Sequence, residues 1–337
     1  MPILLFGADT TTTTTTRMHH QQGDVRKNVT TRNRTSPVGF LLVVAVVVCS
    51  VVFLGNLEGR LHLSDYVPST TAFVQETAVA LKEHDNLHVI PKIVHQSWRD
   101  DSVPVRGGAG GDYRQWIQSW AGGTCHKDPS WKYIFWTDRD NRELFRKYLP
   151  QYLKTYDRIP LPVERADMSR YAYMYVVGGV YADLDFDCLQ DFDALLQRKD
   201  IRTTGAFISS EPWIQSFLLF GRETMACNAI MGSAPGHPLW LALLDRIAKT
   251  DASTCVSRIL ECTGPVALDE EYRRDDMKQR VTMLSSDYFY PEIAVNNLAN
   301  MGGKCHDKKN HNDTQIQRAC QIIQNYKIGS SLWTNNT

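Results

Sequence analysis

The chain has 337 residues, enough for one large domain with additional segments. Lys+Arg and Asp+Glu both number 37, so the formal net charge is zero and gives no electrostatic case for a nucleic-acid partner. Apolar and aromatic residues are frequent enough to predict a globular core of ordinary size.

The N-terminal part predicts a membrane anchor rather than a folded domain. Residues 1–37 hold a threonine run and scattered basic residues, a composition typical of a disordered cytosolic tail. Residues 38–55 are apolar and uncharged from Val38 to Leu54, near the short end of the roughly 17–25 residues that cross a bilayer. The basic residues precede this segment, so the positive-inside rule predicts a single-pass type II protein. The short span favours a Golgi or ER membrane, with a stem at residues 56–88 and a luminal domain at residues 89–337.

The luminal part begins with a predicted strand at residues 92–98, KIVHQSW. Residues 112–121 and 138–148 are predicted helices, and residues 131–136 form a second predicted strand. Trp98 lies at the carboxyl end of the first strand, where ligands bind in open α/β sheets. There it could stack on a nucleobase, or alternatively pack as a rim tryptophan on the following loop.

Residues 164–187, ERADMSRYAYMYVVGGVYADLDFD, are the centre of the chain. The first part predicts a buried helix, and Gly178-Gly179 supplies the positive φ angles that end it and turn the chain into a strand. Asp167 and Arg170 are three residues apart and therefore share a helix face. These two side chains could grip a donor sugar together, or they could form an ordinary ion pair on the helix surface.

The strand that follows predicts a row of carboxylates. On an extended chain Asp183, Asp185 and Asp187 point one way, while Leu184 and Phe186 point into the core. Carboxylates held together repel one another unless a cation or hydrogen-bond donors compensate. Their hard oxygen ligands suit Mg²⁺ or Mn²⁺, cations that in turn bind a diphosphate.

The pattern AD-x-x-RY followed by GG-x-Y-x-D-x-D resembles the donor-site signature of glycosyltransferase family 32, which includes Golgi and sphingolipid mannosyltransferases. The resemblance covers roughly residues 89–333. It implies an α/β GT-A fold, a Rossmann-like sheet with helices on both faces. It also implies transfer of a sugar from a nucleotide sugar with retention of anomeric configuration.

The resemblance assigns roles to individual residues. Asp185 is the expected ligand of Mn²⁺ or Mg²⁺, Asp187 joins the metal directly or through water, and Ser331 of the terminal Ser-x-Trp can reach it. Asp183, Asp185 and Arg170 are the expected catalytic residues. The residues expected to bind the donor are Trp98, Asp167, Arg170, Tyr181, Asp183, Asn228 and Trp333.

The block PVERAD resembles sphingolipid mannosyltransferases, which favours GDP-mannose as the donor, although UDP-sugar enzymes share the motifs. The expected acceptor is a glycan or glycolipid hydroxyl in the Golgi, and no nucleic acid is expected as a partner. Two alternatives stay open. An apolar run before D-x-D also occurs in haloacid-dehalogenase-like phosphohydrolases, and a catalytically inactive Golgi glycan-binding protein would keep the fold.

Cysteine usage predicts an oxidising compartment. Seven cysteines lie beyond the apolar segment, with no C-x-x-C pair, so a zinc ribbon is not expected. Up to three disulfides with one thiol left over are expected. The pairs predicted are Cys255 with Cys262 and Cys305 with Cys320.

Overall fold

The computed structural model describes residues 60–62, 88–105, 112–122, 125–290, 293, 297–310 and 312–334. The side chains of residues 60–62, 298, 299, 308 and 325–334 are not described. The predicted tail, the predicted anchor and most of the predicted stem lie outside these residues. In the described part of the chain, no helix combines the length and the apolar character that crossing a membrane requires.

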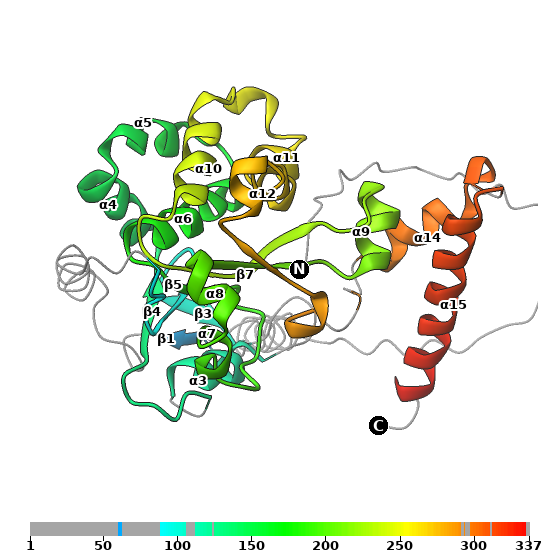
Figure 1. The fold of residues 1–337 in the computed structure, drawn as a ribbon, viewed down its shortest axis with the longest axis horizontal. Helices are drawn as coiled ribbons and strands as arrows, with labels where there is room; N and C mark the ends of the chain where they lie inside the picture. Colours follow the sequence, from blue (N-terminus) through cyan, green and yellow to red (C-terminus); the bar gives the residue numbers. More distant parts are fainter. Residues whose placement is uncertain are drawn as a thin grey trace, which may run out of the picture. The chain divides into compact units, whose positions relative to one another are not determined.

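The centre of the described part is a mixed six-stranded sheet of order β4-β2-β5-β7-β6-β8 (Figure 1). Strand β7 runs antiparallel to both neighbours, whereas β2 is parallel to β4 and β5, and β6 is parallel to β8. A separate pair joins β1 to β3 antiparallel. The strands are β1 (Arg60–His62), β2 (Ile93–Ser97), β3 (Ser102–Pro104), β4 (Lys132–Trp136), β5 (Gly179–Ala182), β6 (Ala206–Ser210), β7 (Ala226–Ser233) and β8 (Thr282–Leu284).

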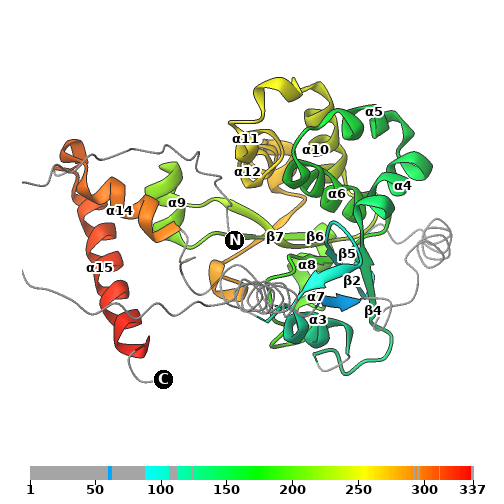
Figure 2. The ribbon, with the colours of Figure 1, turned by 180° about the vertical axis from the view of Figure 1, so that it is seen from behind.

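Helices cover both faces of the sheet, as Figures 1 and 2 show. The helices packed on one face are α4 (Asp138–Tyr148), α5 (Pro150–Arg158), α6 (Pro162–Val176), α10 (Pro238–Lys249), α11 (Ile259–Cys262), α12 (Pro265–Tyr272) and α13 (Asp275–Lys278). Those on the other face are α3 (Tyr113–Ala121), α7 (Asp193–Leu196) and α8 (Lys199–Thr204). The remaining helices, α9 (Trp213–Phe220), α14 (Leu298–His306) and α15 (Thr314–Thr334), share a small apolar cluster of their own. The predicted α/β class is therefore confirmed, with a mixed sheet.

The strands and helices predicted between residues 92 and 148 are present, with boundaries close to those predicted. The strands predicted at 92–98 and 131–136 correspond to β2 and β4, and the two predicted helices correspond to α3 and α4. Helix α4 starts at a capping box in which Thr137 and Asp140 exchange hydrogen bonds with each other's backbone. These boundaries were predictable because local patterning and capping residues fix them.

Helix α6 is buried on nearly every side and delivers polar groups into the interior. Met168, Tyr171 and Met174 are fully buried. The charged residues Asp167 and Arg170 are only 2% and 5% exposed to solvent. The helix ends where Gly178 (φ 71°) and Gly179 (φ 99°) turn the chain into β5. This confirms the predicted glycine turn and brings α6 directly beside the end of β5.

His95 holds that turn from the neighbouring strand. Its Nδ1 accepts a hydrogen bond from Trp136 Nε1 at 3.0 Å, so Nε2 carries the proton and donates to the Gly178 carbonyl at 2.7 Å. Burial lowers the pKa of His95 to about 4, so the ring stays neutral. His95 is therefore a structural residue that fixes the junction of α6 and β5.

The disulfides follow the prediction and extend it. The two predicted pairs, Cys255–Cys262 and Cys305–Cys320, are both formed. A third disulfide, Cys125–Cys188, joins residues 63 apart and was not predicted. Cys227 is a free buried thiol.

The close approach at Gly179 yields a stability prediction. A Cβ at Gly179 would lie 2.6 Å from the Ile93 carbonyl oxygen, whereas a Cβ at Gly221 (φ 65°) would meet nothing within 4 Å. We expect Gly221→Ala to lose only about 1–2 kcal/mol for its left-handed backbone, and Gly179→Ala to lose on the order of 3 kcal/mol or more. Urea unfolding of the two variants measures the difference, and equal losses would contradict the packing described for the α6–β5 junction.

Candidate functional site

The acidic residues form a turn at the end of β5. The strand ends at Ala182, Asp183 N–H donates to the Ala229 carbonyl at 2.8 Å, and Phe186 N–H donates to the Asp183 carbonyl at 3.3 Å. The expectation of an extended strand through Asp187 is therefore wrong. Its cause is that pairing with β7 stops at Ala182 opposite Ile230, so no ladder keeps the next residues extended. We call residues 183–188 the acidic turn.

Asp183 is held by donors from three elements. Its Oδ1 accepts from the Tyr181 hydroxyl at 2.7 Å and pairs with Arg170 Nη1 at 2.9 Å, and its carbonyl accepts from Gln96 Nε2 at 3.1 Å. The Arg170 guanidinium also lies over the Tyr181 ring, 4.7 Å from its centroid. These contacts fix the orientation of the Asp183 carboxylate.

Asp167 and Asn228 lie behind Arg170. Both carboxylate oxygens of Asp167 accept hydrogen bonds at 3.0 Å, one from Asn228 Nδ2 and the other from the Thr263 hydroxyl. Arg170 Nη2 lies 3.4 Å from Asp167 and its Nη1 donates to the Asn228 carbonyl at 2.9 Å. Burial raises the pKa of Asp167, and the charge of Arg170 opposes this. The predicted helix pair of Asp167 and Arg170 is thus one part of a larger buried network.

The side chains of this network differ in how far they are exposed to solvent. The side chains of Asp167, Arg170 and Asp183 are 2%, 6% and 15% exposed. Asp183 is therefore the member that a ligand would reach first. Among the buried polar atoms that have no hydrogen-bond partner in the described residues, three belong to residues predicted to bind the donor: Trp98 Nε1, Arg170 Nε and Asn228 Oδ1. Unpaired buried polar atoms are costly, so these are the groups that a polar ligand would satisfy.

Asp185 differs from Asp183 in having no cationic partner. It forms no ion pair with any side chain that the structure describes, and burial followed by repulsion from Asp183 raises its pKa to about 6. Asp187 accepts from Gln115 Nε2 at 3.2 Å. A half-buried carboxylate that has no counter-charge among the described residues, beside a second carboxylate, is a donor set that suits a hard divalent cation.

The three aspartates are not gathered into a preformed cage. Among the described residues, the one group of three His, Cys, Asp or Glu side chains whose ligand atoms lie within 4.8 Å of one another is Cys125, His126 and Cys188. The two sulfurs of that group form a disulfide and are not available as thiolates. A cation at the acidic turn would therefore be held by Asp185 together with a bound ligand, as Mg²⁺ is in many phosphate-binding sites.

The other predicted site residues have different outcomes. Trp98 is half-buried against Tyr113, with ring centroids 5.6 Å apart, so it lies near the acidic turn on the side of α3. Burial, followed by the charges of Asp185 and Asp183, raises the pKa of Tyr113. Ser331 and Trp333 belong to the last turns of α15, where side chains lie outside the described residues.

The residues that sequence reasoning missed are those that hold the site from neighbouring strands. Gln96 donates to the Asp183 backbone and accepts from the Tyr133 hydroxyl at 2.9 Å. The sequence places Gln96 at the end of a predicted strand, but it does not show that Gln96 contacts Asp183 at the end of another strand. The register of β2 against β4 and β5 decides that contact, and register is not contained in either segment alone.

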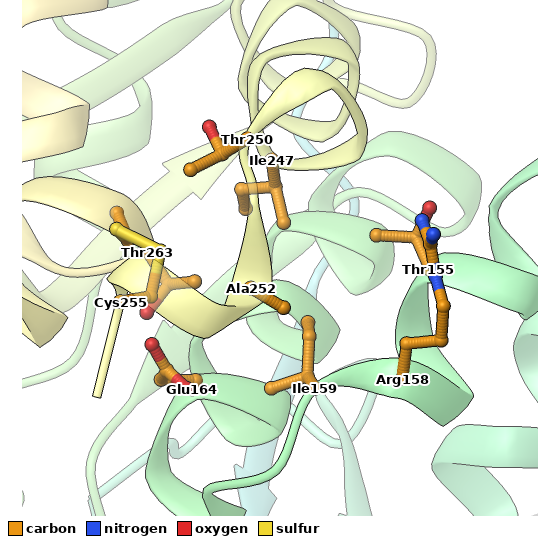
Figure 3. Close-up of a pocket in the computed structure, with 10 residues that line it drawn as sticks. Thr155, Arg158, Ile159, Glu164, Ile247, Thr250, Ala252, Cys255 and Thr263 are labelled. Atoms are coloured by element: carbon orange, nitrogen blue, oxygen red, sulfur yellow. A yellow bond between two sulfur atoms is a disulfide. The ribbon is translucent and has the colours of Figure 1, made fainter.

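A small cavity lies beside the network and ends at Glu164 (Figure 3). Glu164 is 1% exposed, and neither carboxylate oxygen has a hydrogen-bond partner among the described residues. The cavity measures about 20 Å³, room for a single water. No residue of the acidic turn lines it. The residues that do are Thr155, Arg158, Ile159, Glu164, Ile247, Thr250, Ala252, Cys255, Cys262 and Thr263.

Comparison with known proteins identifies the region that contains α6, β5 and the acidic turn. Residues 112–202 match a family model described as a glycosyltransferase sugar-binding region containing a DXD motif. Together with the relatives described next, this match confirms the resemblance to glycosyltransferase family 32.

Several of the curated relatives that match are fungal mannosyltransferases. Inositol phosphoceramide mannosyltransferase 2 of Schizosaccharomyces pombe is 30% identical over 224 residues, 64% of this chain and 56% of the relative. Mannosyl phosphorylinositol ceramide synthase SUR1 of Saccharomyces cerevisiae is 30% identical over 197 residues, 55% of this chain and 43% of the relative. The chain thus spans about half the length of the curated relatives it matches.

One further relative is a mannosyltransferase whose name does not refer to a ceramide lipid, and one solved structure also matches. An initiation-specific alpha-1,6-mannosyltransferase of Candida albicans is 25% identical over 182 residues, 49% of this chain and 44% of the relative. The solved PaToxG glycosyltransferase covers 75% of this chain and 87% of its own, with 12% identity and a TM-score of 0.37. So loose a superposition adds nothing to the fold described above.

The unpartnered Glu164 carboxyl yields a prediction about pH and stability. Burial, with a smaller effect of Asp167, raises the pKa of Glu164 above its ordinary value of 4.5. The folded chain therefore keeps this proton longer than the unfolded chain, and it loses stability as the pH rises from the ordinary value through the raised one. We expect Glu164→Gln to melt at a higher temperature than the wild type at about pH 7.5, and to show no advantage at about pH 4. Thermal unfolding at both pH values measures this, and equal melting temperatures at the higher pH would contradict it.

Proposed function

We propose that this chain, in which residues 112–202 form a glycosyltransferase sugar-binding region containing a DXD motif, transfers a hexose from a nucleotide sugar to the hydroxyl of a glycan or glycolipid. Mannose is the favoured hexose because the relatives described above are named as mannosyltransferases. The names of two of those relatives also refer to an inositol-phosphate-containing ceramide, which favours a glycolipid as the acceptor.

One observation carries the proposal. Arg170, Tyr181 and Asp183 are held together next to Asp185, which has no counter-charge among the described residues. A structural ion pair alone explains Asp183 but leaves the half-buried Asp185 uncompensated. A nucleoside diphosphate bound through a divalent cation supplies both the missing positive charge and acceptors for the unpaired N–H groups of Trp98 and Arg170.

The proposal extends to the fold and the compartment. A mixed sheet with the acidic turn at the end of the central strand β5, and helices on both faces, supports a GT-A domain. Three disulfides support an oxidising compartment such as the Golgi or ER lumen. With the apolar segment at residues 38–55, this supports a type II membrane protein whose catalytic domain is luminal.

Mn²⁺ or Mg²⁺ is the proposed cofactor, and Asp185 is the residue that would hold it, with Asp187 as a second carboxylate of the acidic turn. When bound, such a cation neutralises the charge that grows on the leaving diphosphate. The oxygen donors of the acidic turn suit either ion, because both are hard cations that keep several non-protein ligands.

The chain's own residues orient the donor. Arg170 is fixed by Asp183, Asp167 and the Asn228 carbonyl, and its unpaired Nε is the donor left for a sugar or phosphate oxygen. The unpaired Oδ1 of Asn228 can accept from a sugar hydroxyl, and the half-buried Trp98 offers a ring for the base. Asp167 has both oxygens occupied, so we assign it the task of fixing Arg170 and Asn228.

We propose retention of anomeric configuration by a same-face displacement, in which the leaving phosphate assists deprotonation of the acceptor hydroxyl. Among the carboxylates of the described site, Asp183 and Asp167 are held by hydrogen bonds and ion pairs, and Asp185 and Asp187 are assigned to the cation, which leaves none of them as a nucleophile. Nuclear magnetic resonance of the product identifies its anomer, and an inverted product would exclude this route.

The direct test uses a panel of nucleotide sugars with Mn²⁺, scored by release of nucleoside diphosphate. We expect GDP-mannose to be turned over fastest. Asp185→Asn should lower turnover by about 100-fold or more while the melting temperature stays within a few degrees. The control is Asp276→Asn, which removes an exposed carboxylate outside the site. Full turnover by the Asp185→Asn protein would refute the proposal.

Two other functions make different predictions in the same assay. A phosphohydrolase would release inorganic phosphate from sugar phosphates without an acceptor, but its first aspartate must be free to attack phosphorus. Asp183 is instead tied to Arg170 and Tyr181. An inactive glycan-binding protein would release no nucleoside diphosphate with any donor.

The raised pKa of Asp185 predicts how the cation requirement depends on pH. A carboxylate must lose its proton to bind a cation, and the pKa of Asp185 is raised to about 6. We therefore expect the Mn²⁺ concentration for half-maximal binding to rise by about tenfold per pH unit below pH 6, and to be nearly constant above pH 7. Titrating Mn²⁺ by electron paramagnetic resonance at several pH values measures this. A half-maximal concentration unchanged down to pH 5 would contradict the assignment of Asp185.

A further inference from the structure

Helix α3 runs beside the acidic turn and contacts it at three successive residues. Gln115 Nε2 donates to Asp187 Oδ2 at 3.2 Å. Trp120 Nε1 donates to the Phe186 carbonyl at 2.8 Å, and the Ser119 hydroxyl accepts from Cys188 N–H at 3.0 Å. One face of a single helix therefore binds a side chain, a carbonyl and an N–H of the turn.

A covalent bond reinforces the same contact. Cys125, which follows α3, is joined by a disulfide to Cys188, the residue directly after Asp187. The helix and the turn are therefore linked by one disulfide and three hydrogen bonds within a short stretch of each chain segment. We call this set of contacts the α3 clamp, and its members are Gln115, Ser119, Trp120 and Cys125 on one side and residues 186–188 on the other.

Helix α3 does not need these contacts for its own stability. Asp112 caps its first turn by accepting from Arg114 N–H and Gln115 N–H, and Tyr113, Ile117 and Trp120 are buried. Ile117 and Tyr113 belong to an apolar cluster with Val103 and Phe135 of neighbouring strands. The Gln115 side chain is exposed and is not part of this apolar cluster. Its amide nitrogen donates a hydrogen bond to the Asp187 carboxylate.

We propose that the α3 clamp positions the acidic turn for its cation, with Gln115 orienting Asp187 and the Cys125–Cys188 disulfide fixing the end of the turn. This inference rests on the proposed function, because it assigns positioning residues to the proposed cation site. Its physical basis is that Asp183 is fixed from the α6 side, whereas Asp187 has no partner from that side among the described residues. Without the clamp the carboxylates of the turn are free to move apart and relieve their mutual repulsion.

The sharpest test replaces Gln115 and leaves the fold unchanged. Gln115→Met keeps the length and helix propensity of the side chain but removes its amide donor. The matched control is Gln118→Met, an exposed glutamine on the same helix without a side-chain contact to the turn. Mn²⁺ affinity is measured by electron paramagnetic resonance on the full-length protein at a fixed concentration of GDP, without acceptor, and melting temperatures are measured in parallel.

We expect Gln115→Met to weaken Mn²⁺ binding by about tenfold, the lower end of the 10–100-fold that follows loss of a residue orienting a metal ligand. The melting temperature should stay at the wild-type value, and Gln118→Met should bind Mn²⁺ as the wild type does. Equal Mn²⁺ affinity in the two variants would overturn the role of Gln115, although the proposed function would stand. Absence of Mn²⁺ binding by the wild type would overturn both.

A second pair of variants tests the disulfide. We expect Cys125→Ser with Cys188→Ser to weaken Mn²⁺ binding by about tenfold or more and to raise the KM for Mn²⁺ more than it lowers kcat. Cys305→Ser with Cys320→Ser removes a disulfide of the α14–α15 region and should leave Mn²⁺ affinity unchanged. Equal Mn²⁺ affinity of these two double variants would overturn the role of the Cys125–Cys188 disulfide. If the first double variant does not fold, the Gln115 comparison still decides the proposal.

Discussion

The site depends on the buried ion pair between Arg170 and Asp183, which are 2.9 Å apart. Arg170 projects from α6 on one face of the sheet, and Asp183 begins the acidic turn at the end of β5. A buried charge is destabilising unless it is paired and hydrogen-bonded. Tyr181, Asp167 and the Asn228 carbonyl supply the remaining partners. The pair therefore fixes the helix, the strand end and the turn relative to one another.

The pair also explains why neighbouring carboxylates differ. Asp183 is neutralised by Arg170, whereas Asp185, two residues later, has no counter-charge in the described part of the chain, and its pKa is raised to about 6 by burial and by Asp183. One carboxylate is thus fixed as a hydrogen-bonding group, and the other is left for a cation. The α3 clamp holds the far end of the same turn at residues 186–188. The turn is therefore held on both sides with Asp185 between them.

Local sequence was enough to predict the parts that local chemistry fixes. The strand at Lys92 to Trp98 and the glycine turn after α6 both follow from short-range patterns. The partners of Asp183, the disulfide across 63 residues and the unpaired Glu164 arise from tertiary packing and could not be predicted in this way. The acidic residues form a turn instead of a strand because β7 stops pairing at Ala182, a consequence of sheet register.

The central claim is that a divalent cation binds Asp185 while Arg170 stays paired with Asp183. Anomalous X-ray scattering at the manganese edge, from crystals grown with Mn²⁺ and a nucleoside diphosphate, tests this most directly. The account predicts one strong manganese peak within ligand distance of Asp185 and of a diphosphate oxygen, with the Arg170–Asp183 contact unchanged. A manganese peak at any other place, or an Arg170 side chain swung away from Asp183, would contradict it.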